Sequence, residues 1–316
     1  MKPLFIVNPR AGGGQTGRAI EGLLDVARKS LGDIDVSPTE RPRHATDLAR
    51  EAALAGREVV VAVGGDGSIH EVANGLMQAR EQGATATSLG IVGQGTGGDF
   101  RKALGIEHRL DRYLATIASG VARPIDVGHF AYVTHDGREA EGYFVNILSV
   151  GMGGLVDAYV AQTTKAFGGT IAYFAASARA MVDSQLARLA ITARDPSGQT
   201  RELEVDSRML AICNGQFFGS GMHVAPMASL VDGKLDVVSI GGASLLSFAR
   251  ASGRIYSGRH LTEPGVEHFR CDRLTIELLG GADRALFCLD VDGEPLGRLP
   301  ITVRVLPAAL PVLLPA

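Results

Sequence analysis

The sequence predicts two domains, an α/β domain followed by an all-β domain. In the first third of the chain, short apolar runs alternate with segments whose apolar residues recur at helical spacing, which is typical of a doubly wound parallel sheet. Beyond Pro124 the strand-like runs are separated by hairpin-like turns such as Asp195-Pro196-Ser197-Gly198, which indicates antiparallel strands. A length of 316 residues is enough for two hydrophobic cores, at about 100–200 residues per domain.

The elements of the first domain follow one another as strand, loop and helix. The expected strands are residues 4–7, 34–36, 59–63 and 88–92, and the expected helices are residues 19–31, 44–55 and 69–82. Because Val59–Val63 is apolar throughout, this strand is expected to be covered on both faces, as in a parallel sheet. In the second domain a helical insertion at about 170–184 interrupts the strands, and a last strand at 301–306 could complete either domain.

Composition and charge exclude several classes of protein. Thirty-one basic against 34 acidic residues give a net charge of −3, so no cationic field of the whole chain recruits nucleic acid. Three widely separated cysteines argue against a disulfide scaffold or a zinc site. No signal peptide is apparent, and no apolar run approaches the roughly 20 residues that span a bilayer. We therefore expect a cytoplasmic protein.

Glycine is the most distinctive residue of the chain, at 41 of 316 residues. Glycine-rich loops at 12–14, 64–67 and 93–98 follow three predicted strands, so in a doubly wound sheet they lie together at the carboxyl edge, where ligands bind. Glycine lets backbone N–H groups approach phosphate oxygens, and a following helix N-terminus adds a favourable dipole. A nucleotide-phosphate site is thus expected, although none of the loops is a Walker or GxGxxG motif and each alone could be a tight turn.

Asp66 in the second loop has two interpretations. An Asx turn would use its carboxylate structurally. At a phosphate site the same carboxylate would instead bind Mg²⁺ or accept a proton from an attacking hydroxyl, and we favour this catalytic interpretation. By the same reasoning Thr96 becomes a hydroxyl donor to phosphate and Asp99 a carboxylate of the metal network.

At this point the motifs resemble a known family. Val63-Gly64-Gly65-Asp66-Gly67-Ser68 with Glu71 and Asn74, preceded by Asn8-Pro9 and followed by Gly95-Thr96 and Asp99, resembles the diacylglycerol kinase catalytic domain. More specifically, the chain is similar to the bacterial YegS-like lipid kinases, relatives of sphingosine and ceramide kinases. The likeness continues through Asn214-Gly215, Asp232-Gly233-Lys234 and Asp292-Gly293-Glu294.

The resemblance implies a fold and an activity. It implies a Rossmann-like first domain of the NAD kinase/phosphofructokinase type at residues 1–125, joined by the C-terminal strand 301–316, and an antiparallel β-sandwich at 126–300. It also implies an ATP- and Mg²⁺-dependent lipid kinase, with ATP in the cleft between the domains and a lipid hydroxyl as acceptor. Diacylglycerol, phosphatidylglycerol and a sphingoid base remain open as the lipid.

The resemblance also assigns roles to particular residues. The nucleotide contacts implied are Asn8, Pro9, Thr39, Gly64, Gly65, Asp66, Gly67, Ser68, Ile69, His70, Glu71, Gly95 and Thr96. A structural Mg²⁺ is implied at the Asp232 side chain and the Ser229 and Lys234 carbonyls, and oxygen-only ligation suits this ion. One carboxylate of the pair Asp292 and Glu294 would be the base, for which we favour Glu294. Without the resemblance, the pattern favours an Asp-Gly hairpin turn.

Departures from the family pattern leave other functions open. Ser68 replaces the usual threonine and His70 an asparagine, Gly93 stands where proline is frequent, and Gly97-Gly98 lacks an expected amide. Alternatives are a kinase of the same superfold acting on a soluble substrate, or an inactive nucleotide-binding regulator.

Contact with the membrane is expected to be local. Two basic clusters, within 250–273 and within 101–112, either touch anionic headgroups of the inner membrane surface transiently or form ordinary charged faces. The sequence leaves the oligomeric state open.

Overall fold

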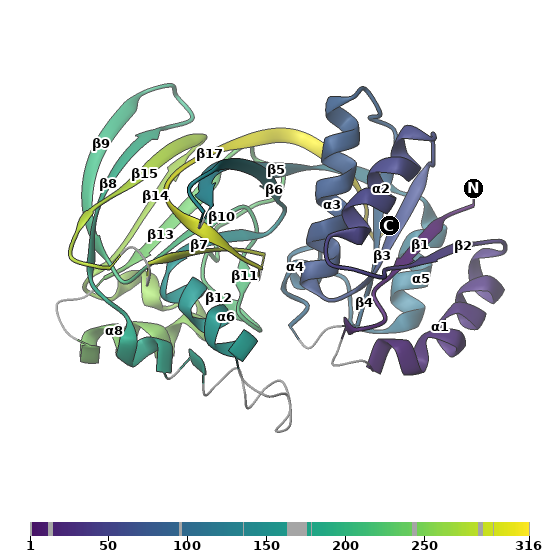
Figure 1. The fold of residues 1–316 in the computed structure, drawn as a ribbon, viewed down its shortest axis with the longest axis horizontal. Coiled ribbons are helices and arrows are strands. Elements are labelled where there is room, and N and C mark those ends of the chain that lie inside the picture. Colours follow the sequence, from purple (N-terminus) through teal and green to yellow (C-terminus); the bar gives the residue numbers. More distant parts are fainter. Residues whose placement is uncertain are drawn as a thin grey trace. The chain divides into compact units, whose positions relative to one another are not determined.

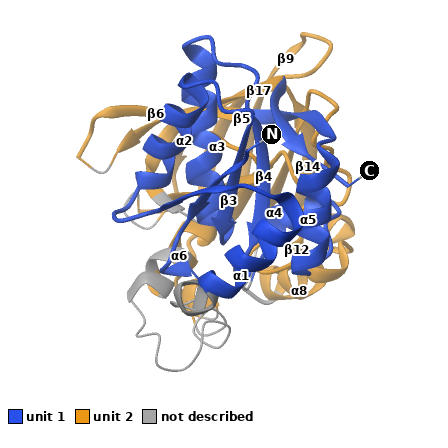
Figure 2. Cartoon of the chain, turned by 90° about the vertical axis from the view of Figure 1, so that its right-hand side faces the viewer, with its two compact units in different colours: residues 1–127, 308–316 blue, residues 128–307 orange. Residues whose placement is uncertain are grey.

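The chain forms two compact units. The computed structural model describes residues 2–11, 15–94, 97–134, 136–162, 176–177, 179–241, 245–283, 287–292 and 294–315. Unit 1 comprises Met1–Val127 with Ala308–Ala316, and unit 2 comprises Gly128–Pro307 (Figure 2). The limits expected from the sequence were 125/126 and 300/301.

Unit 1 alternates strands with helices along the chain (Figure 1). Its elements are β1 (Leu4–Val7), α1 (Gln15–Leu31), β2 (Asp35–Pro38), α2 (His44–Leu54), β3 (Val59–Gly64), α3 (Asp66–Glu81), β4 (Ser88–Gly93), α4 (Asp99–Ala103) and α5 (Leu110–Ser119). From here β5 (Ala122–Thr134) leads the chain into unit 2, and β17 (Glu294–Leu313) brings it back.

The sheet of unit 1 is parallel, as the sequence predicts. Its strands lie in the order β2, β1, β3, β4, and the end of β17 adds to β4 by pairing Val312 with Leu89. All residues of β1, β3 and β4 are buried, which explains why these runs are apolar throughout. Helix α2 packs against α3 and helix α1 against α5, and Figure 2 shows the two pairs on opposite sides of the strands.

The main correction to the predicted elements concerns the start of α3. The sequence places this helix from residue 69, whereas it begins at Asp66, with Gly65 as the extended N-cap residue. The backbone N–H groups of Ser68 and Ile69 both donate to the Gly65 carbonyl, at 3.0 and 3.1 Å. The Gly-Asp-Gly-Ser segment is therefore the first turn of the helix, where the positive end of the helix dipole stabilises the negative charge of the aspartate.

Unit 2 is built mainly from antiparallel strands. Besides β5 and β17 its elements are β6 (Glu139–Phe144), β7 (Ile147–Gly151), α6 (Met152–Gln162), β8 (Ala187–Arg194), β9 (Thr200–Ser207), β10 (Met209–Cys213), β11 (Phe217–Phe218), β12 (Met222–His223), β13 (Leu235–Ile240), α8 (Leu245–Arg254), η3 (Ile255–Ser257), η4 (His260–Thr262), β14 (Val266–Cys271), β15 (Arg273–Gly280) and β16 (Cys288–Val291). One branch of the sheet runs β14, β13, β10, β7, β16, β17, and a second runs β17, β15, β8, β9.

Two apolar clusters stabilise unit 2. In the first, side chains from both branches of the sheet pack face to face, as in a β-sandwich. In the second, the opposite faces of β7, β10 and β13 pack against residues of α6 and α8, so these three strands are buried on both sides. The predicted helical insertion at 170–184 is only partly within the described residues, where 176–177 and 179–183 are helical. Helix α6 was not predicted, because Gly151, Gly153 and Gly154 obscure its pattern.

Candidate active site

The ends of β1 and β3 meet through two polar side chains. Asn8 follows β1 directly, and its Nδ2 donates to Oγ of Ser68 in the first turn of α3 at 3.2 Å. The Asn8 backbone N–H donates to the Val63 carbonyl at 3.0 Å. A Cβ at Gly64 would lie 2.3 Å from the Ser68 Oγ, so the glycine is required for this close approach. Asn8, directly after β1, and the loop that follows β3 therefore meet at the carboxyl edge of the sheet, whereas the glycine loop at 12–14 lies outside the described residues.

The N-terminus of α3 carries the features of a phosphate site. Gly65, the N-cap residue, has no side chain of its own that could accept a hydrogen bond from the first N–H groups of the helix. An N-terminus of this kind presents backbone N–H donors and the positive end of the helix dipole to an anion. The carboxyl end of β2 lies beside that of β1, since the Thr39 N–H donates to the Val7 carbonyl at 2.8 Å. Gly95 and Thr96, the remaining predicted phosphate contacts, lie outside the described residues.

Asp66 has a structural use that neither interpretation of the sequence anticipated. Its two carboxylate oxygens accept the backbone N–H groups of Asp99 and Phe100, each at 3.3 Å. These donors open α4, so Asp66 in the first turn of α3 also caps a second helix. The positive ends of both helix dipoles favour its negative charge.

Asp99 is stabilised by a lysine. Its carboxylate is buried, and Nζ of Lys102 lies 2.8 Å from its Oδ1. Gly98 precedes it as the N-cap residue of α4 in the left-handed conformation, with φ 58°. The Gly97-Gly98 departure from the family pattern is thus accommodated in the turn that starts α4. The Lys102 partner was missed from the sequence, although its i+3 spacing on a predicted basic segment is a usable signal.

Glu71 and His70 make contacts within unit 1. The Glu71 carboxylate accepts the backbone N–H groups of Arg43 and Ala45, each at 3.1 Å, and so caps the start of α2. Nδ2 of Asn74, one helical turn on, donates to the His70 carbonyl at 2.9 Å. The residues predicted from 64 to 71 as nucleotide contacts therefore lie in two different environments. Gly64 and Ser68 lie beside Asn8, whereas the Glu71 carboxylate caps the start of α2.

In unit 2 the acidic turn is a hairpin with a buried aspartate. Val291 of β16 pairs with Glu294 of β17 across a two-residue turn, as the Asp-Gly pattern predicts. Asp292 has a left-handed backbone, with φ 50°, and is 8% exposed. Its carboxylate accepts three backbone N–H groups, those of residues 145, 146 and 147, at 3.0–3.1 Å. The Glu294 side chain lies outside the described residues.

Two buried asparagines fix the same backbone segment. Nδ2 of Asn214 donates to the Val145 carbonyl at 2.8 Å, and the Asn214 N–H donates to the Asn146 carbonyl at 2.9 Å. Nδ2 of Asn146 in turn donates to the Phe217 carbonyl at 2.8 Å. Asn146 was missed from the sequence, where the signal was a polar residue between the apolar runs Tyr143–Val145 and Ile147–Leu148. The acidic turn is therefore held by a network of hydrogen bonds.

The predicted Mg²⁺ loop has oxygen donors in a compact turn. Oδ1 of Asp232 accepts the Lys234 N–H at 3.2 Å, and Gly233 between them has a left-handed φ of 67°. Burial raises the pKa of Asp232, an effect that a bound cation would oppose. The neighbouring Asp236 is already matched by His268 and Arg270, at 2.8 and 2.9 Å. In the part of the chain that the structure describes, no three His, Cys, Asp or Glu side chains gather as a metal site.

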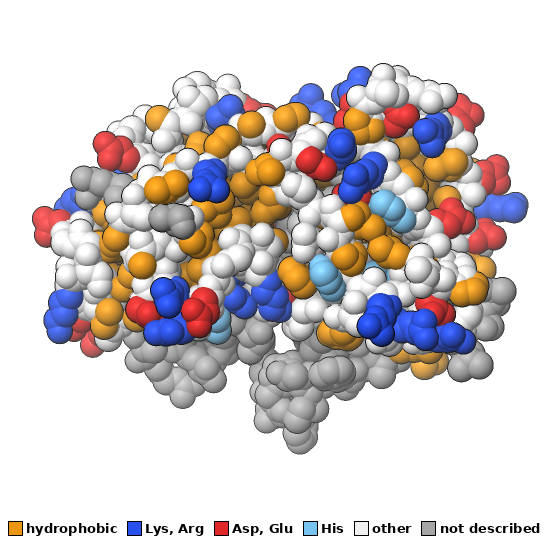
Figure 3. All heavy atoms as spheres, turned by 180° about the vertical axis from the view of Figure 1, so that it is seen from behind, with side chains coloured by type: hydrophobic (Ala, Val, Ile, Leu, Met, Phe, Trp, Pro, Cys, Tyr) orange, Lys and Arg blue, Asp and Glu red, His pale blue; other side chains and the backbone are white. Residues whose placement is uncertain are grey.

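The expected basic clusters are largely neutralised by acidic partners. In the 250–273 cluster, Arg250 and Arg254 both pair with Glu263, and Arg270 pairs with Asp236. In the 101–112 cluster the basic residues Lys102, Arg109 and Arg112 pair with Asp99, Asp111 and Glu107. Figure 3 likewise shows basic and acidic side chains interspersed on the face that it presents. Among the described helices, none is both long and apolar enough to cross a membrane.

Comparison with known proteins covers both units. Residues 2–130 match the diacylglycerol kinase catalytic domain, and residues 146–314 match the YegS C-terminal NAD kinase beta sandwich-like domain. The chain is 27% identical over 297 residues to a diacylglycerol kinase of Bacillus subtilis, covering 94% of this chain and 90% of the relative. It is also 27% identical over 289 residues to lipid kinase YegS of Escherichia coli K12, covering 89% and 86%.

Solved structures support the same fold. A diacylglycerol kinase from Bacillus anthracis aligns over 99% of this chain and 97% of its own, with a TM-score of 0.69 and 21% identity. Yeast NADH kinase in complex with NADH aligns over 100% and 84%, with a TM-score of 0.51 and 11% identity. At these identities the solved structures support the fold alone. That fold is the predicted α/β domain with a β-sandwich. Given the sequence matches over both units, the chain belongs to the diacylglycerol kinase catalytic-domain family, in its YegS-like branch, and is an enzyme of that lipid-kinase family.

Proposed function

We propose that the protein transfers the γ-phosphate of ATP to a hydroxyl group of a membrane lipid, with Mg²⁺. The observation that supports this most directly is the N-terminus of α3, which lies at the carboxyl edge of the parallel sheet beside the hydrogen-bonded Asn8 and Ser68. Ligands of doubly wound sheets bind at this edge, and helix N-termini bind phosphate. The relatives named diacylglycerol kinase and lipid kinase YegS support a lipid as the acceptor.

In this proposal unit 1 binds and orients the nucleotide. The backbone N–H groups at the start of α3 donate to phosphate oxygens, while Asn8 and Ser68 supply an amide and a hydroxyl beside them. Asp66 fixes the start of α4 relative to α3 through the Asp99 and Phe100 N–H groups, so it is a positioning residue. Preorganised donors of this kind stabilise the charge that develops on the transferred phosphoryl group.

We assign the base to Glu294. The Asp292 carboxylate is already an acceptor for three backbone N–H groups, so its role is to hold the hairpin and the segment 145–147 in place. Glu294 begins β17 two residues later, paired with Val291 of β16. The Glu294 carboxylate then takes the proton from the lipid hydroxyl as the hydroxyl oxygen attacks the γ-phosphorus. The bond from this phosphorus to the β–γ bridging oxygen breaks, and ADP leaves.

The Mg²⁺ of unit 2 is proposed at the Asp232 carboxylate and the Ser229 and Lys234 carbonyls. These are hard oxygen donors, and the partly buried Asp232 carboxylate gains most from a cation. The Asp99 carboxylate, expected from the sequence to belong to the metal network, is instead paired with Lys102 at 2.8 Å and is not among these ligands. When bound with the nucleotide, Mg²⁺ supplies neutralisation of phosphate charge.

The test is a lipid panel with a matched pair of variants. Purified protein, ATP and Mg²⁺ are incubated with vesicles containing diacylglycerol, phosphatidylglycerol or a sphingoid base, and phosphorylated lipid is detected by mass spectrometry. For Glu294→Gln we expect kcat to fall by about 10²–10⁴-fold, the usual effect of losing a general base, with the KM for ATP unchanged. Glu202→Gln, the same change at an exposed position of β9, should retain wild-type activity.

Two other outcomes decide against parts of the proposal. Phosphorylation of a soluble sugar or nucleoside at a rate independent of vesicles would favour a kinase for a soluble substrate. ATP binding without turnover on any lipid would favour a nucleotide-binding regulator. Full activity of Glu294→Gln on a lipid would remove Glu294 as the base but leave the kinase activity in place.

A further inference from the structure

Three arginines form a row across neighbouring strands of unit 2. Arg194 on β8 lies directly opposite Arg273 on β15, and Arg273 lies directly opposite Arg304 on β17. Residues directly opposite one another on antiparallel strands share one face of the sheet, and like charges in such pairs are destabilising. This arginine row therefore concentrates positive charge where strand pairing alone would disfavour it.

The row lies on the outer face of the sheet. The neighbouring register row points into the apolar core and consists of Ala193, Leu274 and Val303. The next row on the outer face consists of three threonines, Thr192, Thr275 and Thr302. The Oγ1 atoms of Thr275 and Thr302 are 3.2 Å apart. Guanidinium donors and hydroxyl groups are thus adjacent on one surface, with no apolar row between them on that face.

The charge of the arginine row is only partly compensated. Asp272 accepts two hydrogen bonds from Arg194, at 2.8 and 2.9 Å. Nε of Arg304 donates to Nδ1 of His129 at 3.4 Å. Among the described residues no carboxylate forms an ion pair with Arg273 or Arg304. Asp272 pairs with Arg194, and Glu141 lies 3.1 Å from the Nε2 of His129, so the two carboxylates leave the three arginines with an excess of positive charge.

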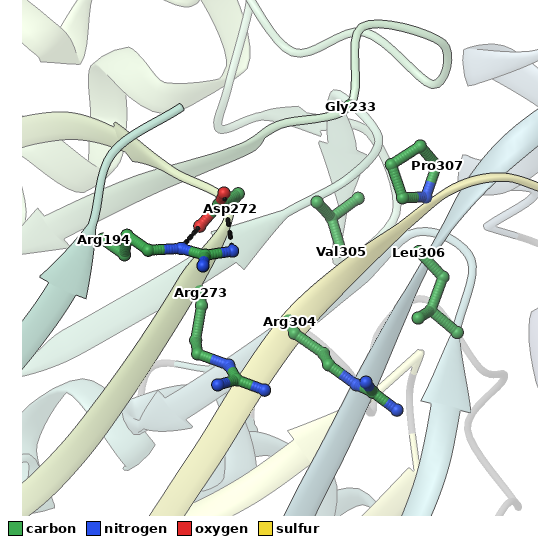
Figure 4. Close-up of a pocket in the computed structure, with 8 residues that line it drawn as sticks. All are labelled: Arg194, Gly233, Asp272, Arg273, Arg304, Val305, Leu306 and Pro307. Carbon is green, nitrogen blue, oxygen red and sulfur yellow. Dashed lines mark hydrogen bonds and ion pairs between the residues drawn. The ribbon is translucent and has the colours of Figure 1, made fainter. Parts of the chain in front are cut away.

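A cavity lies against this charge excess. It has a volume of about 290 Å³ and is lined by the arginine row, by Asp272, and by backbone and apolar atoms of segments that include Gly233 and Pro307. Figure 4 shows Arg194 joined to Asp272, while Arg273 and Arg304 extend from neighbouring strands to the same side. Arg273 and Arg304, which form no ion pair with a carboxylate among the described residues, thus line the same cavity.

We propose that this cavity binds a phosphate group through Arg273 and Arg304. Each guanidinium is a planar fork of N–H donors whose geometry matches phosphate oxygens. A phosphate group carries one or two negative charges on its non-bridging oxygens, which suits two neighbouring guanidinium groups that form no ion pair with a carboxylate among the described residues. The site lies wholly within unit 2 and does not depend on the proposed kinase activity.

The first arm of the test measures binding of inorganic phosphate to the full chain. Thermal unfolding is followed in phosphate and in chloride of equal ionic strength, without nucleotide. Phosphate should raise the midpoint of the wild type by about 2 °C or more relative to the double variant R273Q/R304Q. The control R188Q/R201Q loses two arginines elsewhere in unit 2, each paired with carboxylates, and should behave as the wild type. Stabilisation by salt exclusion, or by phosphate at α3, is common to all three proteins and cancels.

The second arm identifies the source of the phosphate group. If a lipid headgroup is the ligand, R273Q/R304Q should bind phosphatidylglycerol vesicles about 25-fold more weakly in a flotation assay, at about fivefold for each arginine near the surface. If the double variant loses the thermal stabilisation by inorganic phosphate, the ligand is a small phosphate. If it loses only the binding to vesicles, the ligand is a lipid headgroup. Equal behaviour of the wild type, the control and the double variant in both arms would overturn the proposal.

Discussion

At the scale of single residues, two aspartates that the sequence marks as catalytic both hold backbone. Asp292 accepts three N–H groups from 145–147, and Asp66 accepts two from the start of α4. The family pattern carries the identity of such residues but not the atoms they contact. Those contacts join positions about 33 to 147 residues apart, which only the folded chain brings together.

The Asp292 carboxylate is expected to matter for stability as well as for activity. Asp292→Ala leaves three buried N–H groups without an acceptor and should lower the free energy of unfolding by about 3 kcal/mol or more. Asp292→Asn keeps one acceptor oxygen and tolerates the left-handed backbone, so its loss should be about 1–3 kcal/mol. Urea unfolding measures both. The exposed Asp206→Ala serves as control, and a wild-type unfolding curve for Asp292→Ala would refute the positioning role.

Asp66 is expected to protect the start of α4. Removing its acceptor oxygens in Asp66→Ala should lower the free energy of unfolding by about 1–2 kcal/mol, as for other helix caps. Amide hydrogen exchange at Asp99 and Phe100 should become faster, because these are the N–H groups that Asp66 accepts. Asp111→Ala, a change in the first turn of α5 at an exposed side chain, provides the comparison. Unchanged exchange at both amides in Asp66→Ala would contradict this role.

At the scale of elements, the sequence predicts most of unit 1 and less of its loops. Apolar runs and helical spacing located β1, β3, β4 and α2, because these elements bury residues in a regular pattern. The predicted start of α3 was wrong, because the residues from Gly65 to Ser68 have the composition of a loop. Only the hydrogen bonds from the Ser68 and Ile69 N–H groups to the Gly65 carbonyl identify this segment as helical. Glycine and aspartate are common both in loops and in first turns of helices, so local pattern alone does not separate the two.

Packing between β4 and α5 leaves no room for a side chain at Gly93. A Cβ at Gly93 would lie 2.5 Å from the Tyr113 Oη, which is also 2.8 Å from Nδ1 of His108. Gly93→Ala should therefore lower the free energy of unfolding by about 1–3 kcal/mol. In a Tyr113→Phe background the same change should be less destabilising, and a double-mutant cycle by urea unfolding measures the coupling. Strictly additive effects would show that the two residues do not compete for space.

The segment containing η4 is expected to make stability depend on pH. His260 is fully buried, its Nε2 lies 3.0 Å from the Val224 carbonyl, and burial lowers its pKa below the ordinary value of 6.5. The unfolded chain therefore binds a proton more readily than the folded one, so the free energy of unfolding should fall as pH drops below about 6.5. One proton accounts for at most about 1.4 kcal/mol per pH unit.

A variant isolates this contribution from that of His223, whose pKa burial also lowers. His260→Gln keeps an amide donor for the Val224 carbonyl but does not titrate. Its free energy of unfolding, measured in urea between pH 7.5 and pH 5, should decline less steeply than that of the wild type. The difference between the two slopes should correspond to at most about one proton per molecule. Parallel curves for the two proteins would exclude His260 as a source of the pH dependence.

At the scale of the whole molecule, the two units contribute different parts of the proposed reaction. Unit 1 supplies a parallel sheet with a helix N-terminus for phosphate, and unit 2 supplies the hairpin of Asp292 and Glu294 on an antiparallel framework. The fold class could be predicted from periodicity and turns because both report burial directly. Lipid specificity could not, because it depends on the shape of a groove formed by side chains from many separated strands.

The most direct test of this account is the fate of labelled phosphate. Purified protein is given γ-labelled ATP, Mg²⁺ and mixed vesicles, and the label is followed into the chloroform-soluble phase. We predict label in a phospholipid product from the wild type, and a reduction of about 10²-fold or more in Glu294→Gln. Label found only in water-soluble products, or no transfer to any vesicle lipid, would contradict the assignment of a lipid hydroxyl as the acceptor.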